Sequence, residues 1–193
     1  MREEITAHLL EGAALRKKVA ENFADVIEEM ARIIIEGFKA GARLCIAGNG
    51  GSAADAQHIA GELVGRFRYD REPLPALAIT TDTSVMTAIA NDYGFDEIFL
   101  RQVKAHLKKG DAFLAISTSG NSPNILRAAE YAKEVGAHVL VLTGGNGGKL
   151  AAAACKALVV PAEETWKIQE IHIAVGHILC GLIEDAIFPG GKK

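Results

Sequence analysis

The sequence lacks an excess of basic residues and lacks long apolar runs. Its 193 residues carry 21 Lys and Arg against 24 Asp and Glu, for a formal net charge of −3. Proteins that bind nucleic acid by neutralising phosphates usually carry surplus basic charge. No stretch approaches the roughly 18 uninterrupted apolar residues that indicate a membrane-spanning helix. We therefore expect no nucleic-acid partner and no membrane partner.

Cysteine is also scarce. The three cysteines, Cys45, Cys155 and Cys180, are widely separated and odd in number. They show neither the spacing of metal ligands nor a disulfide framework, and reduced thiols are typical of the cytosol. The N-terminus, MREEITAHLL, carries acidic residues early and has no apolar run like that of a signal peptide. These features predict a cytoplasmic protein.

An apolar stripe near the N-terminus predicts a helix over residues 15–40. Its positions recur at steps of three and four residues, as expected for one helix face: Phe23, Ile27, Met30, Ile34 and Phe38. A helix this apolar must be covered, either by its own domain or by another subunit. The pattern alone leaves both possibilities open for the N-terminal helical segment, residues 1–40.

Short apolar runs then alternate with segments of helical character. The runs span residues 43–47, 76–80, 112–117, 138–143 and 157–160. Continuous apolar strands that alternate with helices indicate a mostly parallel sheet covered on both faces. We expect one α/β domain over residues 1–193, with a doubly wound five-stranded sheet, an N-terminal helical extension and a long final helix over residues 164–187.

Two loops at the carboxyl ends of strands are candidate ligand sites, because ligands bind at that edge of such sheets. The first, residues 47–55, reads AGNGGSAAD. Its glycines permit close approach of the backbone to a ligand, and Ser52 is placed to cap a helix whose free N–H groups favour an anion. The loop also satisfies a relaxed dinucleotide fingerprint, with Asp82 placed to hold a ribose, so a nucleotide-dependent enzyme stays open.

The second loop, residues 117–123, reads STSGNSP and is more specific. Three hydroxyl residues precede a glycine, and Ser122 and Pro123 stand at the N-cap and first position of a helix. Hydroxyls and free amides without a lysine suit a phosphate monoester. A dinucleotide site does not need this loop, so a phosphate ligand is favoured over NAD.

The helix after the first loop places His58, Glu62 and Arg66 at intervals of four residues, hence along one face. An imidazole and a carboxylate one turn apart can share a zinc ion, although an exposed polar stripe has the same spacing. In the final helix, Gln169 and His177 stand eight residues apart. That is ~12 Å along the axis, so spacing alone does not assign both residues to one metal.

The loop at residues 117–122 and the segment that follows resemble the signature of the sugar isomerase (SIS) domain. With residues 48–58, Ala90-Asn91-Asp92-Tyr93-Gly94 and the stretch from Ile168 to His177, nearly the whole chain is similar to the phosphoheptose isomerase family. That resemblance implies interconversion of sedoheptulose 7-phosphate and D-glycero-D-manno-heptose 7-phosphate through an enediol(ate), leading to nucleotide-activated heptose. It also implies a homotetramer with active sites at subunit interfaces.

The resemblance assigns roles to individual residues. Glu62 and His177 are implied as the catalytic base and acid. One Zn2+ per subunit is implied, with four ligands: His58, Glu62, Gln169 and His177. The implied substrate contacts are Asn49, Gly50, Gly51, Ser52, Glu62, Asn91, Asp92, Ser117, Thr118, Ser119, Ser122 and Gln169. Arg66 is a weaker candidate for contact with the phosphate.

A non-catalytic relative offers the main alternative function. The alternative is a regulatory SIS protein that binds a phosphosugar or associates with a bacterial replication initiator. The initiator-associated relative resembles the same segments of this chain. That relative lacks the acidic residue matching Glu62 and the histidine matching His177. Because this chain has both, the resemblance favours the enzyme.

Overall fold

The computed structural model describes residues 1–191 and shows a parallel sheet between two layers of helices. The sheet has five strands in the order β2-β1-β3-β4-β5, and every neighbouring pair is parallel. The strands are β1 (Leu44–Gly48), β2 (Ala76–Ala78), β3 (Ala112–Ile116), β4 (His138–Gly144) and β5 (Lys156–Val160). The predicted fold class is confirmed, and each predicted strand is present with small shifts at its ends.

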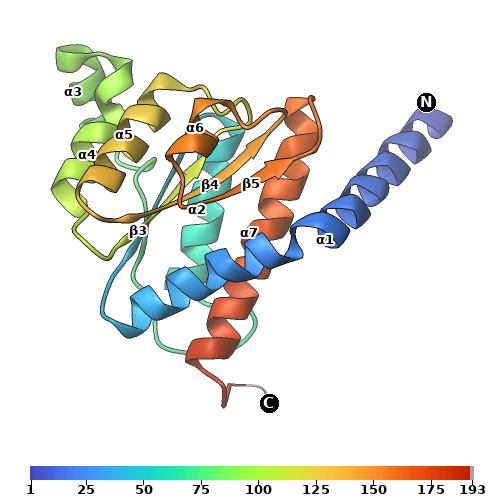
Figure 1. Cartoon of the computed structure of the whole chain (residues 1–193), viewed down its shortest axis with the longest axis horizontal. Coiled ribbons are helices and arrows are strands. Elements are labelled where there is room, and N and C mark those ends of the chain that lie inside the picture. Colours follow the sequence, from blue (N-terminus) through green and yellow to red (C-terminus); the bar gives the residue numbers. More distant parts are fainter. Residues whose placement is uncertain (192–193) are drawn as a thin grey trace.

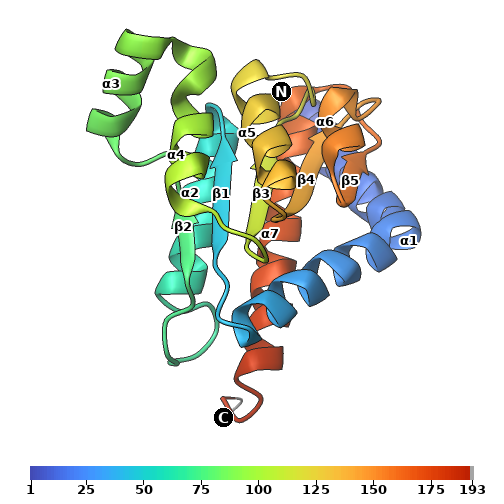
Figure 2. The ribbon, with the colours of Figure 1, turned by 60° about the vertical axis from the view of Figure 1, so that its left-hand side comes forward.

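Helices cover both faces of the sheet (Figures 1 and 2). One layer contains α1 (Arg2–Lys39), α2 (Gly51–Val64) and α7 (Thr165–Ile187). The other contains α4 (Ile98–His106), α5 (Pro123–Glu134) and α6 (Gly148–Ala153). The remaining helix α3 (Thr83–Tyr93) and the short η1 (Phe95–Glu97) lie between β2 and α4 in the chain.

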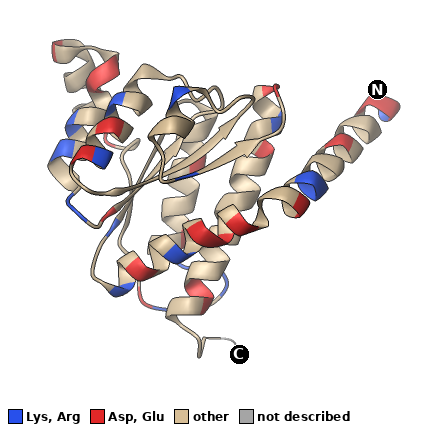
Figure 3. Cartoon of the chain, viewed as in Figure 1, with Lys and Arg blue, Asp and Glu red and all other residues tan. Residues whose placement is uncertain are grey.

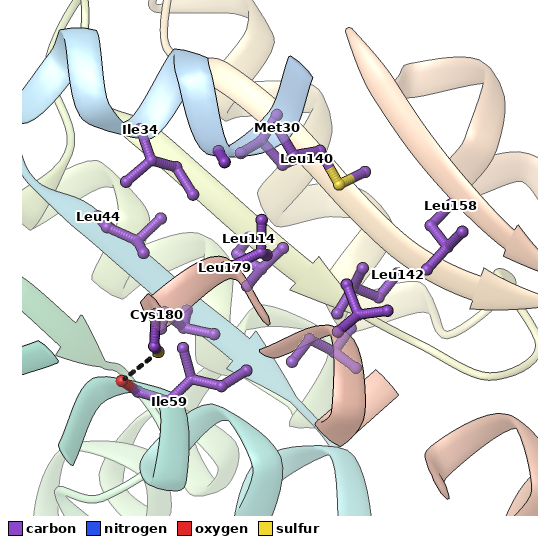
Figure 4. Packing of buried hydrophobic residues seen from close by; sticks show 14 of the residues in the cluster. Met30, Ile34, Leu44, Ile59, Leu114, Leu140, Leu142, Leu158, Leu179 and Cys180 are labelled. Atoms are coloured by element: carbon purple, nitrogen blue, oxygen red, sulfur yellow. Dashed lines mark hydrogen bonds between the residues drawn. The ribbon is translucent and has the colours of Figure 1, made fainter. Parts of the chain in front are cut away.

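Alternation along the strands explains the two layers. In β1, Leu44 and Ile46 join the core under α1, α2 and α7, whereas Cys45 and Ala47 join the core under α4 and α5. Successive side chains of a strand point to opposite faces, so a sheet buried on both sides needs apolar residues throughout. Figure 4 shows the first core, in which Met30, Leu114 and Leu179 come from three different elements.

Helix α1 begins at Arg2, so the predicted start at residue 15 is wrong. The first turns carry exposed side chains and no buried apolar stripe, and periodicity therefore gave no signal there. Figure 1 shows this end of α1 running out beyond the sheet. The predicted final helix is confirmed, with Glu164 at the N-cap of α7.

Charged residues of both signs lie mainly on the helices and connecting loops (Figure 3). In the part of the chain that the structure describes, no helix combines the length and apolar character required to cross a membrane.

Candidate active site

The strand order reverses direction between β1 and β3, and a cavity lies at that point. Strands β2 and β3 flank β1 on opposite sides, so the loops that follow β1 and β3 leave the sheet in different directions. Ligands of open α/β sheets bind in the crevice that such a switch creates. The cavity measures about 300 Å³ and is lined by Asn49, Gly50, Gly51, Ser52, Ile116, Ser117, Thr118, Ser122, Thr165 and Gln169. We call it the switch-point cavity.

The hydroxyl loop after β3 forms one wall of this cavity. Ser122 is the N-cap of α5 and Pro123 its first residue, as predicted. The Ser122 hydroxyl does not cap the helix; it lies 3.1 Å from the Ser117 hydroxyl oxygen. The lining residues include no Lys or Arg. Paired hydroxyls at a helix N-terminus can therefore bind an anion through neutral donors.

Thr118 and Thr165 lie between the switch-point cavity and a second one. The second cavity measures about 310 Å³ and is lined by Thr118, Ser119, Gly144, Gly145, Asn146, Glu163, Thr165 and Ile168. Thr118 lines both cavities, whereas Ser119 lines only the second. Of the four hydroxyl residues predicted to contact phosphate from this loop, three therefore converge on the switch-point cavity.

The glycine loop after β1 forms the opposite wall. Gly50 is the N-cap of α2, with φ of 54°, so the predicted capping role of Ser52 is wrong. Glycine adopts this left-handed conformation readily, which lets the helix begin before Ser52. Ser52 instead lies in the first turn, is 4% exposed and lines the cavity.

Two asparagines connect these walls, and one of them was not predicted. The Asn49 amide donates to Asn124 Oδ1 and the Asn124 amide donates to Asn49 Oδ1, each at 2.9 Å. Asn124 is 1% exposed at the second position of α5. In the sequence, the only available signal was an asparagine directly after the helix-starting Ser122-Pro123.

Beside the cavity, helices α2 and α7 bring together His58, Glu62 and His177. His58 Nε2 lies 3.3 Å from Glu62 Oε1 and 2.8 Å from His177 Nε2. One ligand atom from each of the three residues lies within 4.8 Å of the others. We call this group the His–Glu–His cluster. Two imidazoles and a carboxylate form a donor set that catalytic zinc sites use, so these residues fit a metal ion.

Gln169 lies in the switch-point cavity, two turns before His177 on α7. A Cβ at Gly51 would lie only 2.6 Å from Gln169 Nε2, so a larger residue there would push the Gln169 amide out of its present position. The helix α7 thus runs from the cavity to the His–Glu–His cluster.

Comparison with known proteins identifies the family. The model of the SIS domain family matches residues 8–144. A phosphoheptose isomerase of Aneurinibacillus thermoaerophilus is 49% identical over 97% of this chain and 96% of its own length. One of Rhodospirillum rubrum is 54% identical over 85% of this chain and 87% of its own length. This chain belongs to the phosphoheptose isomerase family of SIS-domain proteins.

Solved structures agree with that assignment to the phosphoheptose isomerase family. The phosphoheptose isomerase of Neisseria gonorrhoeae superposes with a TM-score of 0.90 at 40% identity, covering 95% of this chain and 98% of that one. The enzyme of Francisella tularensis gives 0.91 at 35% identity, covering 95% and 97%. The resemblance predicted from the sequence is thus confirmed at the level of family and fold.

Other residues that the family resemblance suggested lie away from the cavity. Asn91 and Asp92 are exposed on α3, where the Asn91 amide donates to Asp92 Oδ1 at 2.8 Å. Neither residue lines the switch-point cavity of its own chain. Arg66 is exposed and follows Gly65, the C-cap of α2. The prediction that Arg66 continues the helical face of His58 and Glu62 is therefore wrong, because the helix ends at Val64.

Asp55 lies on α2 close to the His–Glu–His cluster, and sequence reasoning left it unassigned. It precedes His58 by one turn of α2, and its Oδ2 is buried without a hydrogen-bond partner among the described residues. Burial raises the pKa of the Asp55 carboxyl to about 6, and the nearby His58 opposes this shift. A carboxyl group in this setting changes charge at mildly acidic pH.

Proposed function

We propose that this protein interconverts sedoheptulose 7-phosphate and D-glycero-D-manno-heptose 7-phosphate. The observation that carries the proposal is the His–Glu–His cluster beside a cavity walled by hydroxyls. A phosphosugar-binding regulator needs only the cavity, whereas an isomerase also needs acid–base groups beside it. The family's curated relatives from Aneurinibacillus thermoaerophilus and Rhodospirillum rubrum carry the name of this enzyme.

The reaction moves a carbonyl group between C2 and C1 through two proton transfers. We assign Glu62 as the base that takes a proton from C1 of the ketose and returns it to C2. His177 donates a proton to the oxygen on C2 and accepts one from the oxygen on C1. The ketose, the enediol and the aldose are isomers, because each proton that is removed is also returned, so atoms and charge balance. Both side chains are only partly buried, which leaves them accessible to a ligand.

The cluster would hold a zinc ion through His58, Glu62 and His177, with Gln169 as the fourth ligand predicted from the resemblance. Bound there, zinc would supply a Lewis acid for the carbonyl and for the negative charge that develops on oxygen. The support within this chain is the donor set and the spacing of its ligand atoms.

We assign the phosphate to the hydroxyl loop together with Ser52, and the sugar hydroxyls to the rest of the glycine loop together with Glu62 and Gln169. The proposed phosphate contacts are Ser52, Ser117, Thr118, Ser119 and Ser122. The proposed sugar contacts in the same chain are Asn49, Gly50, Gly51, Glu62 and Gln169. Most of these residues line one cavity, which supports their binding to a single ligand.

We further propose a homotetramer of single-domain subunits, with α1 at an interface. An apolar groove of about 580 Å³ runs between α1 and α7, and Ile178 and Leu182 are 48% and 41% exposed beside it. Exposed apolar patches of this kind mark association sites. In this assembly, α3 of another subunit would supply Asn91 and Asp92. The free thiols of all three cysteines support action in the cytoplasm.

The decisive test is turnover of sedoheptulose 7-phosphate by purified protein, before and after metal is stripped with a chelator. Aldoheptose phosphate that forms with metal and disappears without it would support both the reaction and the cofactor. Folded, metal-loaded protein that forms no product would refute the isomerase and favour the regulatory function.

A further inference from the structure

A fully buried carboxylate lies behind the His–Glu–His cluster. Glu184 is 0% exposed and stands seven residues after His177 on α7, two helical turns along. Its oxygens accept hydrogen bonds from the backbone N–H groups of Phe67, at 3.1 Å, and Arg68, at 2.9 Å. They also accept from Arg71 Nε at 3.2 Å. Glu184 therefore binds the loop that leaves the end of α2.

The Arg71 guanidinium extends this contact to α2 itself. The Arg71 side chain is only 2% exposed. Its Nη2 donates to the carbonyl oxygen of Glu62 at 2.8 Å, and its Nη1 donates to those of Leu63 and Gly65 at 2.7 and 3.2 Å. The last carbonyls of a helix have no partners within the helix, and a cation is favourable at that end. The planar fork of arginine satisfies several of them at once.

The pair thus links the two helices that carry the cluster. His58 and Glu62 lie on α2 and His177 lies on α7. Closer to the cluster, the helices meet at Gly176, where a Cβ would lie 2.8 Å from Ile59 Cδ1. That contact sets how near the helices approach. Within the cluster, His58 Nε2 and His177 Nε2 also join the helices, and Cys180 Sγ contacts the Ile59 carbonyl oxygen at 3.9 Å. Outside the cluster, the hydrogen bonds of Arg71 and Glu184 are the shortest directional contacts that link α2 to α7 among the described residues, and we take them to set how far one helix is shifted along the other.

We propose that Arg71 and Glu184 are positioning residues that hold Glu62 and the metal ligands in register. The inference rests on the proposed function, because it concerns the same cluster. Replacing a buried ion pair with apolar residues often leaves stability unchanged or higher, so stability alone does not account for the pair. Catalysis, in contrast, is sensitive to displacements of about 1 Å.

The test compares Arg71→Lys with Arg68→Lys in the full chain. Arg68 serves as the matched control because it binds the same stretch of α7, through Gly181 O at 2.7 Å, Asp185, and Glu184 Oε2 at 3.6 Å from Nε. Unlike Arg71, its side chain makes no hydrogen bond to α2 among the described residues. For each variant we would measure kcat, KM, thermal unfolding and Zn2+ affinity by chelator competition. We expect Arg71→Lys to lose roughly 10–100-fold in kcat and in Zn2+ affinity, with KM within threefold. Arg68→Lys should stay within threefold of wild type throughout.

A double variant, Arg71→Met with Glu184→Leu, covers the case in which Arg71→Lys fails to fold. It removes the pair without leaving a lone buried charge. A folded double variant with reduced kcat and Zn2+ affinity supports the proposal. Wild-type kcat and affinity in either folded variant overturn it, as does failure of both variants to fold, since the pair would then serve stability. If the wild-type protein shows no turnover, the proposed function is refuted instead. The Zn2+ affinities of the variants alone then test whether Arg71 and Glu184 position the metal ligands.

Discussion

The switch-point cavity and the α3 segment, residues 82–97, differ in how their side chains are held. Around the cavity, polar groups pair across elements, as Asn49 does with Asn124. On α3, Asn91 and Asp92 bond to each other and remain exposed. Tyr93 and Phe95 beside them are 57% and 59% exposed, and Figure 2 shows α3 standing away from the sheet. The contrast supports the proposed arrangement, in which one chain supplies the catalytic half of its own site and α3 contributes to the site of a neighbouring subunit.

Replacing Glu62, the proposed base in the catalytic half of the site, should have the largest effect on kcat. Glu62→Gln keeps the shape of the side chain but removes its basicity, so kcat should fall by about 10²–10⁴-fold. Steady-state kinetics on folded protein measures this loss. Gln57→Ala, at an exposed position of the same helix, is the matched control and should retain full activity. A Glu62→Gln variant within a few-fold of wild type would remove Glu62 from the mechanism.

Loss of the metal should have the next largest effect. Chelation, or His58→Ala, should lower kcat by roughly 100-fold, because the Lewis acid is lost while the hydroxyl loop stays intact. Zinc should restore the chelated wild type and leave His58→Ala impaired. Phosphate-ester binding, measured by calorimetry, should survive in both cases. Undiminished turnover by metal-free protein would contradict the metal assignment.

A substitution in the α3 segment should have a smaller effect, mainly on KM. Asp92→Ala should raise KM about tenfold through a lost hydrogen bond to the sugar, with little change in kcat. Mixing this variant with Glu62→Gln sharpens the comparison. If α3 serves a neighbouring subunit, co-refolded mixtures should regain activity at low substrate, because some sites then contain both wild-type residues. Mixtures no better than the average of the two variants would place Asp92 outside the neighbour's site.

The smallest effect concerns Asp55. Its carboxyl is protonated more readily in the folded chain than in the unfolded one, since burial raises its pKa from 3.8 to about 6. The stability contributed by the neutral form is therefore present below pH ~4 and lost as pH rises through 6. In metal-free protein, Asp55→Asn should add roughly 1–2 kcal/mol at pH 7.5, given the partial burial, and almost nothing at pH 4. Denaturant unfolding at both pH values measures this difference, and equal gains at both would contradict the assignment.

The fold was predictable because buried parallel strands are short continuous apolar runs, and the two ligand loops follow from their place after β1 and β3. The histidines of α7 were harder. His172 and His177 stand five residues apart, yet His172 is fully buried and donates Nε2–H to the Thr143 carbonyl at 3.2 Å. Burial lowers the pKa of His172 to about 4, so it stays neutral. Periodicity gave no means of separating a core histidine from one beside a ligand site, and only the resemblance chose His177.

Other contacts left no pattern in the sequence at all. Arg71 and Glu184 are 113 residues apart, so no local spacing connects them. The place of Asn91 and Asp92 outside the cavity depends on how the chain leaves β2, which composition does not reveal. Long-range polar contacts depend on tertiary geometry, whereas strands and helices follow from local periodicity.

The reciprocal amide pair of Asn49 and Asn124 has a consequence for the entropy of binding. The two loops are fastened to each other through side chains that need no ligand, one from each side of the strand-order reversal. A ligand that enters such a site does not have to order the loops, so less of its interaction free energy is spent on restricting their motion. A small, strongly hydrated sugar phosphate has few apolar atoms to offer, so its binding depends on polar contacts. Loops that are already joined to each other leave more of the free energy of those contacts for affinity.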